Sequence, residues 1–339
     1  IKFDLLSVVC EDKVRTCIEL MLKSGVIEWQ GSLKATYEKY LGIYTLERTN
    51  KDMWKMLWEH KVISFFQMEK QSGIQAVALC KPESVDDLTA LNSVMRLMAQ
   101  SEGAEQPLEK YARFKNDITL WYKEMSDYGL NQKEQDLLKG ILSTSCGICE
   151  AQEFLIILAQ QPEIGGFSLG WGDRLRRAVA KKKPKDFNEL EKEFFQNAKE
   201  KNLSKPLVNY VWNVLIVTQK SYGFNKSHTI SYSLVGLQEL NLAWKYPIIY
   251  WNCANLIVDS GSTSSEEAAD KSTNYGKIAT AISKMQKSGI DIALPLINQA
   301  ELGFTPDEPN NRIIYSLKAI NGIGDDVVRE IISHRPYTS

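Results

Sequence analysis

The sequence predicts a mainly α-helical protein with a small α/β segment near its C-terminal end. Apolar residues recur at three- and four-residue steps over most of the chain, which is the spacing of one buried helix face. Strand-like alternation is scarce, and its best candidates, 290–296 and 312–316, come late. A polar stretch rich in Ser, Gly and Thr at 259–274 predicts a linker or exposed loop between the two parts.

The expected helices follow one another from the N-terminal side. Two have start signals, because Ser84 precedes acidic residues and Asn131 can cap the helix that begins at 132. A loop is expected at 160–167, and Asp186 with Glu189 three positions later predicts a capped helix that continues to about 201. The predicted helical ranges before that loop are 14–23, 46–62, 85–98, 109–128, 132–141 and 151–161. A further helix is predicted at 275–287.

Length and charge narrow the class of protein. A chain of 339 residues is long for one core, so two or more are expected. A formal net charge of −1 argues against bulk attraction to nucleic acid, and any such contact must be local. No run of eighteen apolar residues is present, so we expect no membrane span. The first residues carry neither an initiator Met nor the anatomy of a signal peptide, and we expect an excised fragment of a larger protein.

Six cysteines are scattered along the chain, and reduced thiols are the expected state. Cys146 and Cys149 have a spacing found in metal sites. A second Cys pair or a His pair with matching spacing is lacking in the sequence. A structural role is therefore favoured over metal or redox chemistry.

A strongly basic segment runs from 170 to 185, with seven Lys/Arg and one Asp, a local charge of +6. If 173–183 is helical, Arg174, Arg177 and Lys181 share one face, because they are three and four residues apart. The sequence has no acid between Arg174 and Lys183, so a bound anion would explain the concentration of charge. A solvated or RNA-binding surface is an equally good interpretation of the charge alone.

The segment 222–232 gathers a cation, an imidazole, hydroxyls, an amide and aromatic rings, a mixture that suits a ligand with phosphate, sugar and base. Gly223 permits an unusual backbone angle, and Asn225 can cap a following helix. Free amides in the first turn of that helix, near Lys226, would favour phosphate. Tyr232 lies one turn after His228, so its ring can stack on a base while the imidazole touches the sugar. The alternative is that the aromatic residues are core side chains.

A Gly-hydrophobic-Gly turn at 320–326 resembles the hairpin of helix-hairpin-helix modules. Without side chains at Gly322 and Gly324, the backbone can approach a DNA phosphate closely. The apolar residues Val327, Val328, Ile331 and Ile332 predict the amphipathic helix that follows. An ordinary tight turn is the alternative interpretation.

Two other stretches are distinct as patterns but say little about chemistry. The stretch 65–69 is interpreted as a buried strand or the start of a helix, where polar Gln67 and Glu69 would be costly if unpaired. Asp4 is a lone carboxylate among apolar neighbours, which by itself indicates a cap or a turn residue.

Taken together, these segments resemble the alpha subunit of bacterial DNA polymerase III, a C-family replicative polymerase. The order of the motifs along nearly the whole chain makes the resemblance more specific than any one of them. The matching stretches are Lys2-Phe-Asp-Leu-Leu-Ser7, Phe66-Gln-Met-Glu69 with Ser72-Gly73, Leu175-Arg-Arg-Ala-Val-Ala-Lys-Lys-Lys183, and Gly223-Phe-Asn-Lys-Ser-His228 with Tyr232. Weaker matches include Gln152-Glu153 and Ile320-Asn-Gly-Ile-Gly324.

The resemblance implies a division of the chain into parts of a polymerase. Residues 1–18 would be the end of the palm, 19–258 the fingers, and 275–339 the start of a DNA- and clamp-binding region with a helix-hairpin-helix element. Asp4 would be the third catalytic carboxylate, which binds Mg²⁺. The other two carboxylates of the family would lie upstream of this chain, so we expect the fragment alone to be inactive.

The resemblance also implies the reaction and its ligands. In template-directed DNA synthesis, a primer 3′ hydroxyl attacks the α-phosphate of a dNTP between two Mg²⁺ ions. The cations would neutralise the triphosphate, the first-turn residues would add phosphate contacts, and the rings would meet sugar and base. The implied nucleotide-binding residues are Arg176, Arg177, Lys181, Lys182, Lys183, Lys226, Ser227, His228 and Tyr232; the implied DNA-binding residues are Asn321, Gly322, Ile323 and Gly324. Asn225 is expected to shape the turn.

The implied partners are primer–template DNA, a dNTP, a sliding clamp and other replisome subunits, in the cytoplasm of a bacterial or phage-infected cell and without a membrane. The chain departs from the family where Leu-Phe-Arg-Pro-Gly-Pro is usual, since 94–99 keeps Arg96 but lacks the Pro-Gly-Pro turn. This departure and Ala180 in place of Gly suggest a divergent member encoded by a bacteriophage. It also leaves open whether the parent polymerase is fully active.

Two rival functions stay open from sequence. A non-enzymatic helical DNA-binding module would use the basic segment and the 321–324 turn to grip phosphates, and it would show a steep salt dependence. A nucleotide-sensing helical regulator ranks last because the sequence has no Gly-rich phosphate cradle of the P-loop kind.

Overall fold

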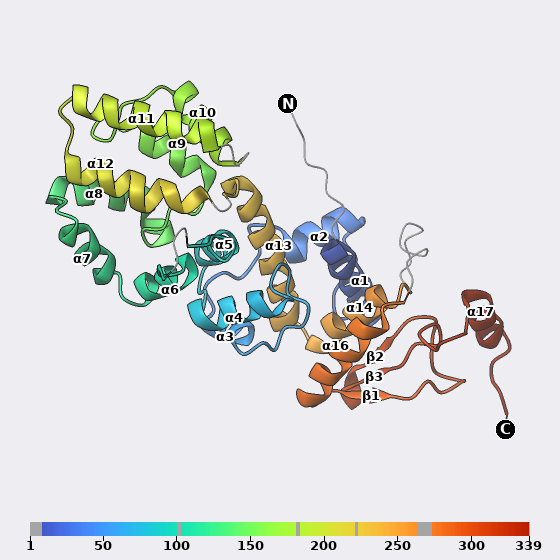
Figure 1. Ribbon diagram of the computed structural model, residues 1–339. Helices are drawn as coiled ribbons and strands as arrows, with labels where there is room; N and C mark the ends of the chain where they lie inside the picture. Colours follow the sequence, from blue (N-terminus) through green and yellow to red (C-terminus); the bar gives the residue numbers. More distant parts are fainter. Residues whose placement is uncertain (1–8, 100–102, 181–183, 221–222, 263–272, 339) are drawn as a thin grey trace. The chain divides into compact units, whose positions relative to one another are not determined.

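The computed structural model describes residues 9–99, 103–180, 184–220, 223–262 and 273–338. The chain divides into two compact units. The middle unit comprises residues 70–234, and the terminal unit comprises residues 1–69 together with residues 235–339. The mainly helical fold with a small sheet near the C-terminal end is as predicted (Figure 1).

The described regular structure of the middle unit is helical, apart from one isolated bridge between Ala151 and Phe224. Stacked and tilted rings fill its core beneath α10 and α11, where Phe167 lies 3.8 Å from Trp171 and Phe194 lies 4.7 Å from Trp212, measured between ring centroids. Its elements are α4 (Gln71–Cys80), α5 (Val85–Val94), α6 (Pro107–Asn116), α7 (Thr119–Asp127), α8 (Gln132–Leu142), α9 (Gln152–Gln160), α10 (Leu169–Ala180), α11 (Pro184–Glu200), α12 (Lys205–Tyr210) and the first residues of α13 (Lys226–Lys245).

A π-helix, Val211–Ile216, continues α12 without a break and passes into the 3-10 turn Val217–Lys220. The rarer i→i+5 hydrogen bonding of a π-helix is often found at functional positions. It brings Gln219, which is fully buried, to the loop before α9, where its side-chain amide donates to the Cys149 carbonyl.

The terminal unit packs helices around buried Trp54 and Trp251 and ends in a small sheet. Within it α1 packs on α14, and α16 contacts β1. The sheet order is β1-β3-β2, with β1 parallel and β2 antiparallel to β3. Its elements are α1 (Val9–Lys23), α2 (Leu33–Leu41), α3 (Lys51–Trp58), the rest of α13, α14 (Ile248–Asp259), α16 (Tyr275–Lys287), β1 (Asp291–Ala293), β2 (Thr305–Asp307), β3 (Arg312–Ile314) and α17 (Asp325–Ser333).

The predicted caps are confirmed at two helices. Ser84 accepts from the Asp87 amide over 3.0 Å, and α5 begins after it. Asn131 and Glu134 form a reciprocal capping box at the start of α8. The helix predicted at 275–287 also has the observed bounds.

Other boundaries differ from the predictions. The helix expected at 46–62 is limited to α3, because Asn50 caps it and the Glu47 carboxylate accepts from the amides of the preceding turn. The range 109–128 is two helices, since the Asp117 side chain accepts from the Thr119 amide and breaks the ladder. Asp186 lies in the first turn of α11 and does not cap it, because the helix already begins at Pro184, a favourable first residue.

The sheet has one strand that the sequence pattern does not reveal. The strands expected at 290–296 and 312–316 are present as the shorter β1 and β3, and β2 is additional. Pro306 stands in the middle of β2, and proline interrupts the signature of a strand. It is tolerated because β2 is at the edge of the sheet.

The stretch 65–69 is a turn and neither a strand nor the start of a helix. Ser64 and Gln67 have positive φ angles of 52° and 68°, which no strand accepts. The buried acid of this region is Glu239 on α13, whose carboxylate accepts from the Phe66 amide over 2.7 Å. Burial raises the pKa of Glu239 well above its ordinary value.

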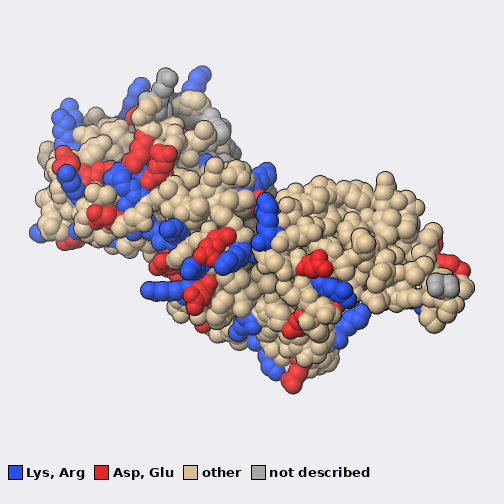
Figure 2. Space-filling model, turned by 90° about the horizontal axis from the view of Figure 1, so that it is seen from below, with Lys and Arg blue, Asp and Glu red and all other residues tan. Residues whose placement is uncertain are grey.

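Charge is distributed differently over the two units on the face shown in Figure 2. Acidic and basic side chains are interspersed on the middle unit, whereas much of the terminal unit is uncharged in that view. No helix in the described part of the chain is long and apolar enough to cross a membrane.

Candidate functional site

The arginines of the basic segment lie on α10 and are paired with acids. Arg176 donates to Asp173 Oδ1 through Nε at 2.9 Å and Nη2 at 2.7 Å. Arg177 Nη2 lies 2.6 Å from Asp173 Oδ2, so one carboxylate bridges two guanidinium groups. The hydrogen bond from Arg176 and the two charges lower the pKa of Asp173. The absence of an acid between Arg174 and Lys183 in sequence therefore does not leave these arginines unpaired.

Arg174 points to a different partner. Its Nη2 lies 3.0 Å from Glu193 Oε1 on α11, and the same carboxylate accepts from the Trp171 indole over 2.6 Å. Lys181, Lys182 and Lys183, which were predicted to share the site, lie outside the described residues.

The turn before α13 is shaped by Asn225, as expected. Its side chain accepts from the Ser227 amide over 3.0 Å, and Glu153 Oε2 accepts from the Lys226 amide over 2.9 Å. The prediction of free first-turn amides is thus wrong for these two groups, because protein oxygens already cap them.

Gly223 is needed for close approach and not for an unusual backbone angle. Its φ is not in the left-handed region, and a Cβ there would meet the side-chain amide oxygen of Gln219 and lie 3.0 Å from Gln152 Cγ. Tyr222 lies outside the described residues.

The rings of the segment form a short stack. The His228 ring lies 5.5 Å from Phe224 with an interplanar angle of 14°, and 4.0 Å from Tyr232 at 55°. All three side chains are half-buried, so Phe224 and Tyr232 are not core residues. The Arg96 guanidinium covers Phe224, 4.7 Å from the ring centroid.

Lys226 reaches back to the loop before α9. Its Nζ lies 3.3 Å from Thr144 Oγ1, 4.0 Å from Glu150 Oε1 and 4.6 Å from the centroid of Phe154. Glu150 is 2 % exposed, and burial raises its pKa to about 7. Lys226 therefore has a carboxyl neighbour that is close to titration at neutral pH.

The start of α9 joins the two predicted segments. Gln152 Oε1 accepts from Arg176 Nη1 over 3.1 Å, and Gln152 Nε2 donates to the Gly223 carbonyl. The backbone N–H of Gln152 also donates to the Phe224 carbonyl over 2.8 Å. Neither Gln152 nor Glu153 was predicted to be functional from its chemistry. Their only signal in the sequence was a weak match within the resemblance.

The hairpin at 321–324 is present in the terminal unit. Gly322 has a φ of 87°, and a Cβ at Gly322 or Gly324 would have no atom within 4 Å. Ile320 and Ile323 pack on the cluster formed by Ala300, Leu317 and Val328. Asn321 is exposed beside the turn.

The helix after the hairpin is less regular in its burial than predicted. Val328 is buried, but Val327 is 51 % exposed and belongs to the outer face of α17. Asp325 and Asp326 lie in its first turn, where Lys318 Nζ pairs with Asp325 at 2.9 Å.

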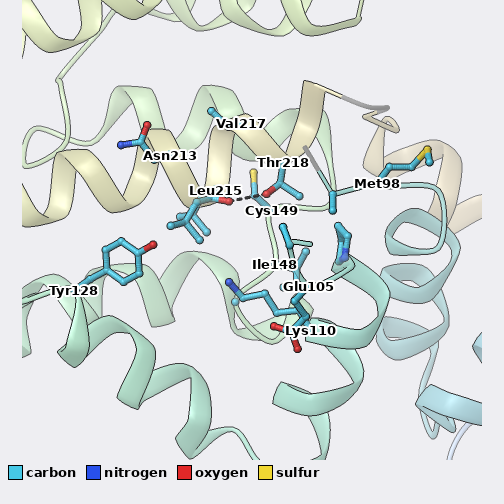
Figure 3. Close-up of a pocket in the computed structure, with 15 residues that line it drawn as sticks. Met98, Glu105, Lys110, Tyr128, Ile148, Cys149, Asn213, Leu215, Val217 and Thr218 are labelled. Atoms are coloured by element: carbon cyan, nitrogen blue, oxygen red, sulfur yellow. Dashed lines mark hydrogen bonds between the residues drawn. The ribbon is translucent and has the colours of Figure 1, made fainter. Parts of the chain in front are cut away.

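A separate cavity of about 350 Å³ lies in the middle unit (Figure 3). The π-helix contributes Asn213 and Leu215 to its wall, and the Thr218 hydroxyl donates to the Val214 carbonyl over 2.6 Å at its edge. Its charged lining residues are already paired, Lys110 with Glu124 at 2.8 Å and Glu105 with Arg113 at 2.7 Å. Among the described residues predicted to bind nucleotide, none lines this cavity.

The Cys146 and Cys149 thiols are held in their protonated form at neutral pH. Burial raises the pKa of Cys146 to about 11 and raises that of Cys149 as well. In the described part of the chain, no group of three His, Cys, Asp or Glu side chains could hold a metal ion. Asp4, the predicted Mg²⁺ ligand, lies outside it.

Comparison with known proteins identifies the family of this chain. Residues 25–202 match the family model of the bacterial DNA polymerase III alpha subunit finger domain, and residues 289–339 match a helix-hairpin-helix motif. The chain is 40 % identical over its whole length to the probable DNA polymerase YorL of Bacillus subtilis and to a DNA-directed DNA polymerase of Bacillus phage SPbeta.

It is 31 % identical to the DNA polymerase III subunit alpha of Borreliella burgdorferi over 83 % of its length. The chain spans 26 % of each of the first two relatives and 22 % of the third, about a quarter of the relatives it matches. The resemblance inferred from the motifs is thereby confirmed, and the chain belongs to the family of the bacterial DNA polymerase III alpha subunit finger domain.

Proposed function

We propose that this chain binds the incoming dNTP and the primer–template DNA within a template-directed DNA polymerase. The observation that carries the proposal is the contact of Gln152 with both predicted segments, Arg176 on one side and Gly223 on the other. Cations that bind phosphate and rings that stack on a base thereby belong to one site of the middle unit.

The side chains differ in how well they are placed for phosphate. Arg177 is 65 % exposed and has one carboxylate partner, so its guanidinium is more accessible than the charged groups of Arg176 and Lys226, which are 32 % and 29 % exposed. Arg176 is 32 % exposed and is held by Asp173 and Gln152, which suits a residue that fixes the geometry as well as binding charge. Lys226 and Ser227 supply further phosphate contacts from the start of α13. Lys181, Lys182 and Lys183 remain part of the proposal through the family resemblance.

The stacked rings suit the remaining parts of a nucleotide. His228 lies between Phe224 and Tyr232, and its position one turn before Tyr232 suits a contact with the sugar. Tyr232 would stack on the nascent base pair, because an aromatic ring accepts any base. This order of cation, imidazole and phenol follows the order of phosphate, sugar and base.

The reaction proposed for the whole polymerase is attack of the primer 3′ hydroxyl on the dNTP α-phosphate. Mg²⁺ would lower the charge barrier in that reaction when bound. The described residues do not form a carboxylate cluster that fits a metal, and Asp4 lies outside them. The role proposed for the described residues is therefore to bind and orient the triphosphate, and no step is assigned to a metal ion.

The terminal unit is the proposed DNA contact. Asn321, Gly322, Ile323 and Gly324 form a turn whose glycines border open space, so that a phosphate can reach the backbone amides. A sliding clamp and other replisome subunits are further proposed partners. The proposed location is the cytoplasm of a bacterial or phage-infected cell.

Fluorescence titration of the chain with a labelled dATP tests the nucleotide site. Arg177→Ala is expected to weaken binding about tenfold, the value of a lost charged hydrogen bond. His228→Ala is expected to weaken dATP binding less, because the rings of Phe224 and Tyr232 remain available to stack on the nucleotide. Arg174→Ala is the matched control, since it removes the same charge from the same helix but pairs with Glu193. Equal affinity of wild type and Arg177→Ala would refute the site.

A non-enzymatic DNA-binding module is the second candidate, and the open hairpin glycines favour it. In that case the chain would bind duplex DNA with a steep salt dependence and without nucleotide dependence. Arg177→Ala would then weaken DNA binding by the loss of one phosphate contact. Neither wild type nor any variant would bind labelled dATP.

A further inference from the structure

The two arginines proposed to bind the triphosphate share one carboxylate, that of Asp173. Its Oδ1 accepts two hydrogen bonds from Arg176, and its Oδ2 lies 2.6 Å from Arg177 Nη2. A carboxylate that spans two guanidinium groups presents the same pair of anionic oxygens as a ligand phosphate would. The groups that would bind ligand are therefore occupied by the protein.

From this geometry we infer that Asp173 is an internal competitor of the ligand triphosphate and sets how tightly Arg176 and Arg177 bind it. The inference rests on the proposed nucleotide site and adds a specificity-determining residue to it. Binding exchanges the Asp173 carboxylate for phosphate at Arg177. The affinity for the anion is therefore reduced by the free energy needed to break the ion pair between Asp173 and Arg177.

If Asp173 instead held the arginines in position for the ligand, its replacement would weaken binding of the triphosphate. Two observations argue against that role. Arg176 has a second anchor, because its Nη1 donates to Gln152 Oε1 over 3.1 Å. Gln152 is in turn fixed by its bond to the Gly223 carbonyl. Arg177 is 65 % exposed, so its flexible side chain can turn from the carboxylate to a ligand without moving the helix. Arg176 therefore does not depend on Asp173 alone for its place, and Arg177 can reach a ligand without it.

The charge of Asp173 also acts on any anion that approaches. It lies about one turn of α10 before both arginines, three and four residues ahead of them. Neutralising it leaves two guanidinium charges where one net charge stood, and attraction of a triphosphate rises accordingly. Replacement of the acid by its isosteric amide is thus expected to strengthen binding.

The test uses the full 339-residue chain and inorganic tripolyphosphate, which carries the charge of the nucleotide without sugar or base. Its affinity is measured by calorimetry, and labelled dATP is titrated in parallel. Asp173→Asn is expected to bind both ligands about fivefold more tightly, the scale of a partly exposed ion pair. In the Arg177→Ala background this gain is expected to be largely lost.

Glu193→Gln is the matched control, because it removes one acid that pairs with an arginine of the same helix, Arg174, outside the proposed contacts. Unchanged or weaker binding by Asp173→Asn would overturn the inference. So would an equal gain from Glu193→Gln, or a gain that survives intact without Arg177, since both indicate only a change of overall charge.

The two proposals fail in different ways. If wild type binds neither ligand, or if Arg177→Ala binds both as well as wild type does, the nucleotide site itself is wrong. If Arg177 matters and Asp173→Asn gives no gain, the site stands and the competitor is wrong. Thermal unfolding of each variant confirms that it is folded before its affinity is compared.

Discussion

Gln152 Oε1 accepts a hydrogen bond from Arg176 Nη1 over 3.1 Å, while the other end of the same amide donates to the Gly223 carbonyl. The side chain is uncharged and half-buried, so its importance lies in what it connects. It joins the basic helix to the turn that begins α13.

Replacing this side chain tests the connection. Gln152→Leu keeps much of the volume but removes both bonds, and it is expected to lower the free energy of unfolding by about 1–2 kcal/mol. Binding of labelled dATP is expected to weaken about fivefold, because Arg176 and the turn are no longer held together. Gln161→Leu is the control, since that side chain bonds only to its own helix, at the Ile157 carbonyl. Equal loss in both variants would show that Gln152 has no special role.

Glu150 predicts a pH dependence of stability. Its pKa is about 7 in the folded chain, mainly because of burial, against 4.5 ordinarily. Lys226 and Ser145 oppose the increase, and Glu153 adds to it. Below about pH 4.5 the carboxyl is protonated in both states and makes no difference. Between 4.5 and 7 the unfolded state loses its proton first, so stability falls as pH rises, and the loss is complete above 7.

The variant Glu150→Gln removes this loss. Its advantage over wild type in urea unfolding is expected to grow by up to about 3 kcal/mol between about pH 4.5 and about pH 8. Exposed Glu163→Gln serves as the control and is expected to show no such growth. A difference between Glu150→Gln and wild type that stays constant with pH would contradict the assignment.

Gly147 is a position where no other residue fits. It has a φ of 81°, and a Cβ would lie 2.5 Å from Cδ2 of buried Trp121. Gly147→Ala is expected to destabilise the chain by more than about 3 kcal/mol, from overpacking and backbone strain together. Chemical denaturation measures this directly.

The matched control for Gly147 is Gly140 in α8, where a Cβ would have no atom within 4 Å apart from its own helix. Gly140→Ala is expected to stabilise the chain by about 0.5–1 kcal/mol, since alanine costs less backbone entropy in a helix. Similar effects of the two substitutions would refute the packing argument at Gly147.

Gly324 offers a test of the hairpin that spares the fold. Its φ is −87°, which alanine accepts, and the added methyl group would point into open space. Gly324→Ala is expected to weaken binding to duplex DNA about fivefold by blocking close approach of a phosphate, with a smaller salt dependence. Gly276→Ala, where a Cβ would lie 3.7 Å from Asn274 Oδ1 at ordinary contact distance, is expected to bind as wild type does.

The sequence predicted the parts of the site better than the contacts between them. The arginines and the segment 223–232 stand out because each concentrates an unusual mixture of side chains. Asp173 precedes Arg176 and Arg177 by three and four residues in the sequence. Helix geometry alone could therefore have predicted its pairing with them. Glu193 and Gln152 could not, because their contacts cross between different helices and join residues 19 and 24 positions apart.

The same limit applies to the fold. Periodicity predicts helices well where one face is buried, as at α8 and α16. It does not reveal a helix break such as the one at Asp117, whose side chain accepts from a backbone amide between α6 and α7. It is also blind to the burial of Glu150, since nothing in its neighbours marks a carboxyl that titrates near neutrality.

The π-helix Val211–Ile216 determines the direction in which the later side chains of the same helix point around its axis. One additional residue in a turn advances each later side chain by about 100° around the axis. Deleting a single residue from this turn would restore regular α-helical spacing and swing Gln219 away from the Cys149 carbonyl. The oxygen that a Cβ at Gly223 would meet would swing away with it, so a change of length at one position would undo a fit at another.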